Sequence, residues 1–137
     1  MSRGLRNCNP GNIRLSGTRY RGEVFPSRDP LFRTFESIEW GYRAIFVLLH
    51  TYAVRYGCRT LRAMICRYAP PSENRTADYL RFVAAQTSID EDACVDTLDR
   101  KTMTAIVSAI SRFENGLSAD PAAVAAGWGL YIADFGG

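Results

Sequence analysis

The strongest constraint on the fold of this chain is a set of apolar residues that recur at three- and four-residue spacing after Ser37. This spacing places them on one face of a helix of about five turns. Gly57 follows the last of them, and glycine is typical of the position just after a helix. The sequence therefore predicts a long amphipathic helix over residues 37–57, with its apolar face formed by Ile38, Tyr42, Ile45, Leu49, Tyr52 and Tyr56.

Four shorter helices are predicted after the long one. The first ends at Ala69, because the residue before a proline avoids helical geometry. Asn74 or Ser72 can cap the next helix, and Asp120 with Pro121 is typical of a helix start. The predicted ranges are 60–69, 74–86, 99–115 with Gly116 closing it, and 121–127 with Gly127 as its stop, followed by an aromatic, glycine-ended tail.

The N-terminal part has a different pattern. Residues 9–12 read Asn-Pro-Gly-Asn, which is turn chemistry. Residues 12–25 predict two short strands around Ser16 and Gly17, with an irregular loop as the alternative, and residues 25–30 predict a loop. The whole chain, residues 1–137, therefore predicts a single α+β domain that is mostly α, with a small N-terminal hairpin and about five helices.

Composition limits the class of protein. The chain is 47% hydrophobic and 12% aromatic, so it can bury a core and is not expected to be disordered. It contains no apolar run of membrane-spanning length, so no membrane insertion is expected. It also opens without an apolar signal core. We therefore expect synthesis in the cytoplasm.

The charge is unevenly distributed. Residues 1–82 hold 14 arginines against 6 acidic residues, a net charge of +8, whereas residues 83–137 hold 3 basic and 8 acidic residues, a net charge of −5. A basic half favours an anionic partner such as nucleic acid or cell-wall polymer. The alternative is a solvated basic surface.

Metal chemistry is not favoured. The four cysteines form no CxxC pair and the chain has one histidine, so neither a metal nor another cofactor is expected. The cysteines are interpreted as small buried hydrophobes, with a disulfide as the alternative.

Glu114 is the first candidate for catalysis. It follows Met103, Val107 and Ile110 along one stripe of its predicted helix, in the last turn. Burial and the negative end of the helix dipole both favour the protonated carboxyl. A carboxylic acid kept neutral near physiological pH can act as the general acid that glycoside cleavage needs. The alternative is a glutamate that turns into solvent or pairs with an arginine.

A second group of polar residues lies at the start of the predicted helix 74–86, which is the helix before that of Glu114. Glu73 is the rival carboxylate, with Asn74 and Thr76 beside it. Its alternative is a helix-entry residue that favours the positive end of the dipole. Tyr79 lies on the apolar face of that helix, where its hydroxyl needs a hydrogen-bond partner if it is buried.

Four segments follow one another along the chain: RGLRNCNPGNIR, FRTFESIEWGYRAIFVLLHTYAVRYG, YAPPSENRTADYLRFVA and ISRFENG. Together they resemble phage and prophage proteins described as virion structural or lysozyme-like proteins. That family carries RNxNPGNIR, APPxENxT and a terminal ENG. Cys8 stands where asparagine is expected, and Arg75 where an acid is expected.

The segments also resemble bacterial glucosaminidases of the lysozyme superfamily, whose catalytic glutamate helix comes first in the chain. Here the helix ending FENG comes last, which suggests a circular permutation with Glu114 as the acid. The resemblance then implies that Asn7, Asn9 and Asn12 line a cleft and bind sugar hydroxyls and acetamido groups. It predicts that Asn9 and Asn12 lie close to Glu114.

The resulting hypothesis is a lysozyme-like domain that cleaves the glycan strands of peptidoglycan, acting at the cell wall or periplasm or in a virion. Glu114 would protonate the glycosidic oxygen, and Glu73 and Tyr79 would orient substrate or stabilise the transition state. Asn74 and Thr76 would bind substrate together with Tyr79. Hydrolase and lytic transglycosylase chemistry both stay open. The alternatives are an inactive lysozyme-like structural protein of a virion or secretion system, in contact with other phage structural proteins, and an arginine-rich protein that binds nucleic acid. The last ranks third because no DNA-reading motif is recognisable.

Overall fold

The computed structural model describes residues 1–71 and 75–136. Six helices and one two-stranded antiparallel sheet form this part of the chain, which is the mostly helical α+β fold that the sequence predicts. The elements are α1 (Arg3–Arg6), β1 (Glu23–Val24), β2 (Thr34–Phe35), α2 (Ile38–Tyr56), α3 (Leu61–Tyr68), α4 (Thr76–Thr87), α5 (Arg100–Asn115) and α6 (Pro121–Phe135).

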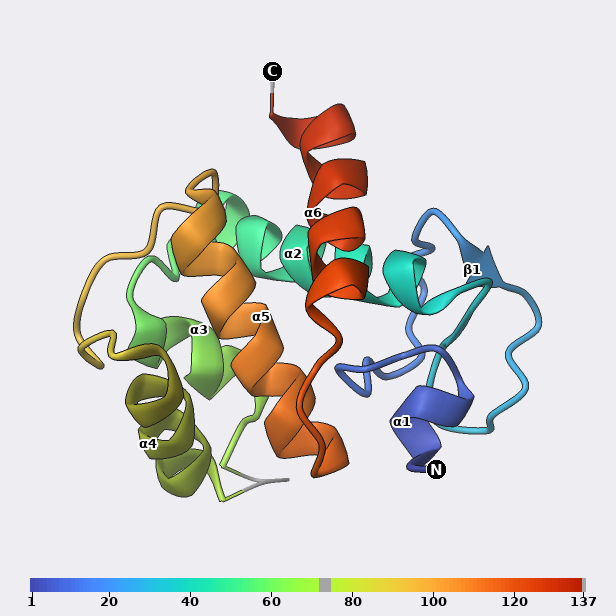
Figure 1. Cartoon of the computed structure of the whole chain (residues 1–137), viewed down its shortest axis with the longest axis horizontal. Coiled ribbons are helices and arrows are strands. Elements are labelled where there is room, and N and C mark those ends of the chain that lie inside the picture. Colours follow the sequence, from blue (N-terminus) through green and yellow to red (C-terminus); the bar gives the residue numbers. More distant parts are fainter. Residues whose placement is uncertain (72–74, 137) are drawn as a thin grey trace.

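The long helix α2 organises the molecule. In Figure 1, α6 stands across α2, while α3, α4 and α5 lie to one side and α1 with the sheet to the other. The apolar core lies among α2, α5 and α6, where packed side chains are fully withdrawn from water. Its members include Ile45, Phe46, Leu49, Met103, Ile106, Val107, Ile110 and Tyr131.

Three predicted helices, α2, α3 and α5, are confirmed together with residues that cap their starts or follow their last turns. Gly57 and Gly116 follow α2 and α5 in the left-handed region, at φ 68° and 73°, which glycine adopts without strain. Thr60 caps α3 by accepting a hydrogen bond from the backbone N–H of Ala63, at 3.1 Å. Asp99 caps α5 in the same way. These boundaries depend on local chemistry, so the sequence shows them.

The predicted stop at Gly127 is wrong, because α6 continues to Phe135. A Cβ added at Gly127 would lie 2.7 Å from Cβ of Tyr42 and 3.0 Å from the backbone N of Arg43. Glycine here permits close packing of α6 on α2 instead of ending the helix. The predicted tail is therefore helical, and Tyr131 within it stacks on Phe46 with ring centroids 5.6 Å apart.

The predicted hairpin around Ser16 and Gly17 is also wrong. The strands pair Glu23 with Phe35 and Val24 with Thr34, so residues 25–33 form the connection. Residues 15–22 contain no strand, which agrees with the alternative prediction of an irregular loop. The α1 turn was not predicted.

Two smaller predictions need correction. Arg75 occupies the N-cap position of α4, and the predicted capping residues Ser72 and Asn74 lie outside the described residues. The cysteines are not buried as expected: Cys66 and Cys94 are exposed, and Cys8 and Cys58 are partly buried. All four are free thiols.

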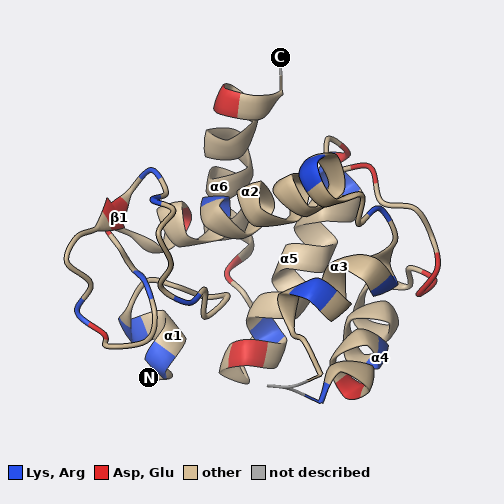
Figure 2. Cartoon of the chain, turned by 180° about the vertical axis from the view of Figure 1, so that it is seen from behind, with Lys and Arg blue, Asp and Glu red and all other residues tan. Residues whose placement is uncertain are grey.

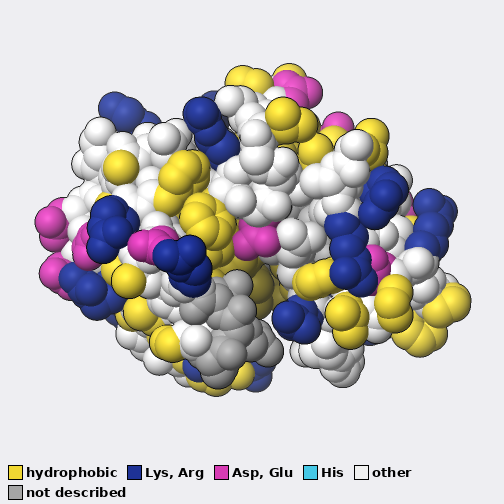
Figure 3. Space-filling model, turned by 90° about the horizontal axis from the view of Figure 1, so that it is seen from below, with side chains coloured by type: hydrophobic (Ala, Val, Ile, Leu, Met, Phe, Trp, Pro, Cys, Tyr) yellow, Lys and Arg dark blue, Asp and Glu magenta, His cyan; other side chains and the backbone are white. Residues whose placement is uncertain are grey.

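Basic residues are prominent on the N-terminal segment and around α3 (Figure 2). The view from below shows several basic side chains over the half of the molecule that contains the N-terminal segment (Figure 3). Among the described helices, none has both the length and the hydrophobicity that a membrane span requires.

Candidate functional site

The N-terminal segment packs against the end of α5. The Ser2 hydroxyl donates a hydrogen bond to Oδ1 of Asn115, at 2.6 Å. Nδ2 of Asn115 donates in turn to the backbone oxygen of Pro10, at 2.8 Å. A Cβ added at Gly4 would lie 2.7 Å from Oδ1 of Asn115 and 2.8 Å from the backbone oxygen of Asn9. Because the second atom belongs to the backbone, this approach requires glycine. The N-terminal segment is therefore joined to the last turn of α5, where Glu114 lies.

Two hydrogen bonds hold the Glu114 carboxyl group. Nδ2 of Asn12 donates to Oε1 at 2.8 Å. The hydroxyl of Tyr79 donates to Oε2, also at 2.8 Å. One donor comes from the N-terminal segment and the other from α4, so the carboxyl is fixed from both sides. The predicted closeness of Asn12 to Glu114 is confirmed.

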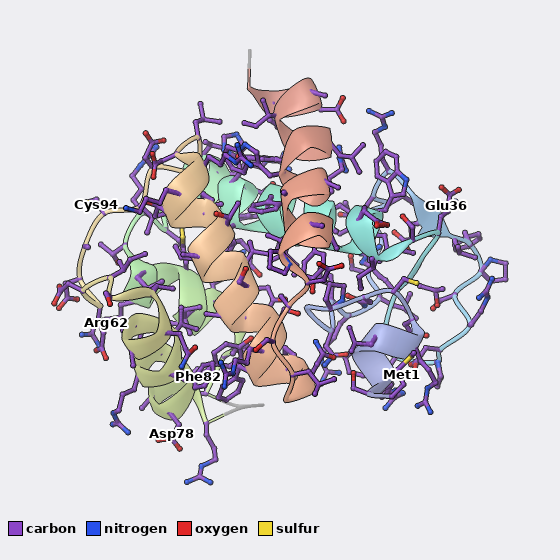
Figure 4. The ribbon with its side chains drawn as sticks, in the orientation of Figure 1. Met1, Glu36, Arg62, Asp78, Phe82 and Cys94 are labelled. Carbon is purple, nitrogen blue, oxygen red and sulfur yellow. The ribbon has the colours of Figure 1, made fainter. Side chains whose placement is uncertain are left out.

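The Tyr79 donor is itself held in place. Its ring is 1% exposed and stacks on Phe113, with centroids 3.9 Å apart. Phe82 of α4 also contacts Phe113, and Figure 4 shows its side chain near the lower end of α5. Burial raises the pKa of Tyr79 well above its usual value. The hydroxyl therefore stays protonated and remains a donor.

Burial raises the pKa of Glu114 above the ordinary glutamate value, although the hydrogen bonds from Asn12 and Tyr79 oppose the shift. The position in the last turn of α5 acts in the same direction as burial, because the helix dipole is negative there. Each carboxyl oxygen that accepts one hydrogen bond keeps a second lone pair. A proton on Glu114 can therefore be offered to a neighbouring group.

Glu114 lines a cavity of about 360 Å³. The walls come from the N-terminal segment, α2, the end of α3 and Glu114 itself, and a volume of this size suits a small-ligand site. Among the described lining residues, Glu114 has the only carboxylate. The other lining residues are Gly11, Asn12, Ile13, Arg14, Ser16, Tyr20, Phe32, Arg33, Leu48, Tyr52, Arg67, Tyr68, Ala69 and Pro70.

Asn9 does not line this cavity, and its side chain is fully buried. Nδ2 donates to the backbone oxygens of Ile13 and Arg33, both at 3.0 Å. Oδ1 accepts from the backbone N–H of Ile13, at 2.9 Å. The expected sugar contact is therefore corrected to an internal role, because the amide is committed to shaping the loop.

Asn7 and Thr76 are placed in the same way. Asn7 is 7% exposed, donates to Asp29 at 3.1 Å and accepts from Thr34. The hydroxyl of Thr76 donates to the backbone oxygen of Ala69, at 2.5 Å. Both were expected to bind substrate, and the structure gives them internal partners instead. The Thr76 contact lies at the cavity wall, because Ala69 lines the cavity.

Two expected site residues, Glu73 and Asn74, lie outside the described residues. Sequence reasoning missed the aromatic and basic wall formed by Tyr20, Tyr68 and Arg67. The Tyr68 hydroxyl donates to the backbone oxygen of Gly11 at 2.5 Å, which ties α3 to the turn. The sequence offers one signal for this wall, because arginine and tyrosine are frequent in the N-terminal half. There the arginines were interpreted only as net charge.

Among residues 1–71 and 75–136, no three His, Cys, Asp or Glu side chains gather as metal ligands would.

The comparisons with known proteins give one informative relationship. No protein-family model matches the chain. The sequence is 40% identical over 118 residues to Protein P5 of Pseudoalteromonas phage PM2. The alignment covers 84% of this chain and 72% of the phage protein. At this identity and coverage, the chain belongs to the same family as Protein P5 of phage PM2.

Proposed function

We propose that this protein cleaves the glycan strands of bacterial peptidoglycan, with Glu114 as the general acid. The observation that carries the proposal is the setting of one carboxyl group. Glu114 lines a cavity, has a raised pKa and is oriented by donors on both of its oxygens. A neutral, oriented carboxyl in a cleft is what protonation of a glycosidic oxygen requires.

The reaction begins when a strand lies in the cavity with a glycosidic oxygen next to Glu114. Proton transfer to that oxygen lets the bond to the anomeric carbon break, and positive charge develops on the sugar ring. Asn12 and Tyr79 then stabilise the carboxylate that remains, because both donate hydrogen bonds to it. Their role is to position and stabilise the acid.

The capture step decides the product. If water attacks the anomeric carbon, the product has a free reducing end, and if a hydroxyl of the same sugar attacks, the product has an anhydro end. Glu73 follows the cavity-lining Pro70 by three positions in the sequence. It remains the candidate for a second carboxylate that activates water.

The test is digestion of purified peptidoglycan, with the fragments identified by mass spectrometry. The proteins are the wild type, Glu114→Gln, Glu73→Gln and a matched control, Glu91→Gln, in a surface ion pair with Arg62. We expect new glycan ends from the wild type and the control, and none from Glu114→Gln. The structure of the ends, reducing or anhydro, names the reaction.

Two results would overturn the proposal. One is full activity in Glu114→Gln. The other is that folded wild-type protein produces no new glycan ends from peptidoglycan of several bacteria over a range of pH and salt.

A structural role in a virion is the second candidate, in which the protein keeps the fold and contacts other phage proteins. The relationship to a phage protein favours it. Co-purification of the folded protein with virions, without any glycan cleavage, would select this candidate. An enzyme carried by a virion would do both, acting at the cell wall after delivery.

A further inference from the structure

The cavity at Glu114 is only one part of a longer groove. A second hollow of about 670 Å³ adjoins it, and the two share five lining residues. The outer hollow extends along α2 towards its end and reaches Phe135 of α6. The shared residues are Ser16, Tyr20, Leu48, Tyr52 and Arg67.

The outer hollow is basic. Arg19, Arg55 and Arg67 line it and are exposed, and no carboxylate is among its described lining residues. None of these three arginines forms an ion pair with a residue that the structure describes. Arg43 also lines the hollow, but Asp134 neutralises it, at 2.8 Å. Three positive charges are therefore available to a ligand.

Arg67 is the best placed of the three, because it lines both hollows. Its guanidinium lies over the ring of Tyr56, 3.7 Å from the centroid, and 5.4 Å from that of Tyr52. Stacking on aromatic faces restricts an arginine before a ligand arrives, which lowers the entropic cost of binding. The planar guanidinium edge remains available for two parallel hydrogen bonds to a carboxylate.

We propose that the outer hollow binds carboxylates carried by the glycan substrate, with Arg67 as the main specificity residue. The inference rests on the proposed function and deepens it. The sugar rings of the strand lie along the groove, and the carboxylates of the peptide stems pair with the arginines. The strand then enters the inner cavity with its next glycosidic bond at Glu114.

A phosphate polymer would also be attracted to these arginines. A carboxylate-bearing glycan fits better, because the adjoining cavity contains the Glu114 carboxyl group, whose position and raised pKa suit proton transfer to a glycosidic oxygen. Nucleic acid is therefore one of the outcomes that the experiment must distinguish.

The experiment measures binding by the full chain carrying Glu114→Gln, so that no ligand is consumed. The probes are soluble peptidoglycan oligosaccharides with free stem carboxylates, the same oligosaccharides with the carboxylates amidated, and a neutral hexamer of N-acetylglucosamine. The added variants are Arg67→Gln and, as control, Arg62→Gln. Arg62 lies on the same helix, is exposed and is not among the lining residues of either hollow, and Figure 4 shows it at the outer edge of the molecule.

We expect Arg67→Gln to weaken binding of the carboxylate-bearing oligosaccharide about tenfold, a change that corresponds to about 1.4 kcal/mol. Binding of the amidated and neutral probes should change little, and Arg62→Gln should match the parent protein for all three. Circular dichroism and thermal melting establish that each variant is folded.

An equal loss for charged and uncharged probes overturns the inference, as does no loss at all. Tighter binding of single-stranded DNA than of the charged oligosaccharide, abolished by Arg67→Gln, would reassign the groove to nucleic acid. Cleavage by the wild type without charge selectivity removes this inference alone. Charge-selective binding without any cleavage removes the enzymatic proposal alone.

Discussion

The N-terminal segment, residues 1–36, and the helical body, residues 38–71 and 75–136, are stabilised in opposite ways. The helical body buries a continuous apolar core. The N-terminal segment has little regular structure and is organised around Arg33, whose side chain is 1% exposed and pairs with Glu23 at 2.5 Å. Arg33 also donates to the backbone oxygen of Thr18 and to the hydroxyl of Ser16.

This difference explains where the candidate site lies. Regular helices place Glu114 and Tyr79 rigidly, and the irregular segment places Asn12 and much of the cavity wall. A segment without regular secondary structure can present polar groups to a ligand, whereas the backbone polar groups of a helix are used in its own hydrogen bonds. The site therefore depends both on the apolar core of the helical body and on the buried polar network around Arg33. The contribution of each to the stability of the fold can be tested separately.

The largest expected effect comes from breaking the polar core. Arg33→Met leaves Glu23 buried without its partner, so we expect a loss of about 3–5 kcal/mol in the free energy of unfolding. Urea denaturation measures it. The double variant Arg33→Met with Glu23→Leu should recover much of the loss, since the unpaired charge is then gone. A single variant as stable as the wild type would show that the polar core is unimportant.

The corresponding test of the apolar side is Gly127→Ala. The added methyl meets Tyr42 at the contact of α6 with α2, and overpacking of this kind costs about 1–3 kcal/mol. The matched control is Gly129→Ala in the same helix, where an added Cβ meets nothing within 4 Å. That variant should gain about 0.5–1 kcal/mol from helix propensity. Equal effects of the two substitutions would refute the close-packing explanation.

The site itself should show a cost in stability. Because the folded-state pKa of Glu114 is raised, its contribution is fully favourable below the ordinary glutamate pKa and is lost as the pH rises through the raised value. Glu114→Gln should therefore be more stable than the wild type at pH 8, and the difference should shrink at pH 4. Urea denaturation at the two pH values measures this, with Gly129→Ala as a control that changes no titratable group. A difference that grows towards pH 4 has the wrong sign.

The smallest expected effect concerns backbone strain in the N-terminal segment. Cys8 has φ 52°, in the left-handed region, which asparagine tolerates better than most residues. Asparagine is also what the family resemblance leads one to expect there. We expect Cys8→Asn to stabilise the fold by about 0.5 kcal/mol and Cys8→Ala not to do so. Thermal melting resolves the two, and an equal gain from alanine would assign the effect to loss of the thiol.

The contrast between the two regions also explains what the sequence could predict. Helix periodicity and local caps place α2, α3 and α5, and counting along the stripe of α5 brings Glu114 to the buried face. Gly127 misled because its role depends on the approach of α2, which is not a local property. The site was predicted only in part, because periodicity places Glu114 on its helix but does not show which residues from other segments approach it.

The polar N-terminal segment could not be derived from periodicity. The partners of Arg33 and Asn9 are set by tertiary contacts, so neither the true strand pairing nor the buried amides were visible in the pattern. The contact of Asn12 with Glu114 was predicted only through the family resemblance. The aromatic and basic groove was missed because Tyr52 was assigned to an apolar stripe and Arg67 to net charge.

The most direct test of the central claim is a pH titration of the Glu114 carboxyl by carbon NMR, with Glu114→Gln used to assign its signal. The account predicts a midpoint above the ordinary glutamate value, and loss of glycan cleavage as the pH passes through that midpoint. In Tyr79→Phe the midpoint should rise further, because a donor to the carboxylate is removed. A midpoint at or below the ordinary glutamate value would contradict the assignment of Glu114 as the acid.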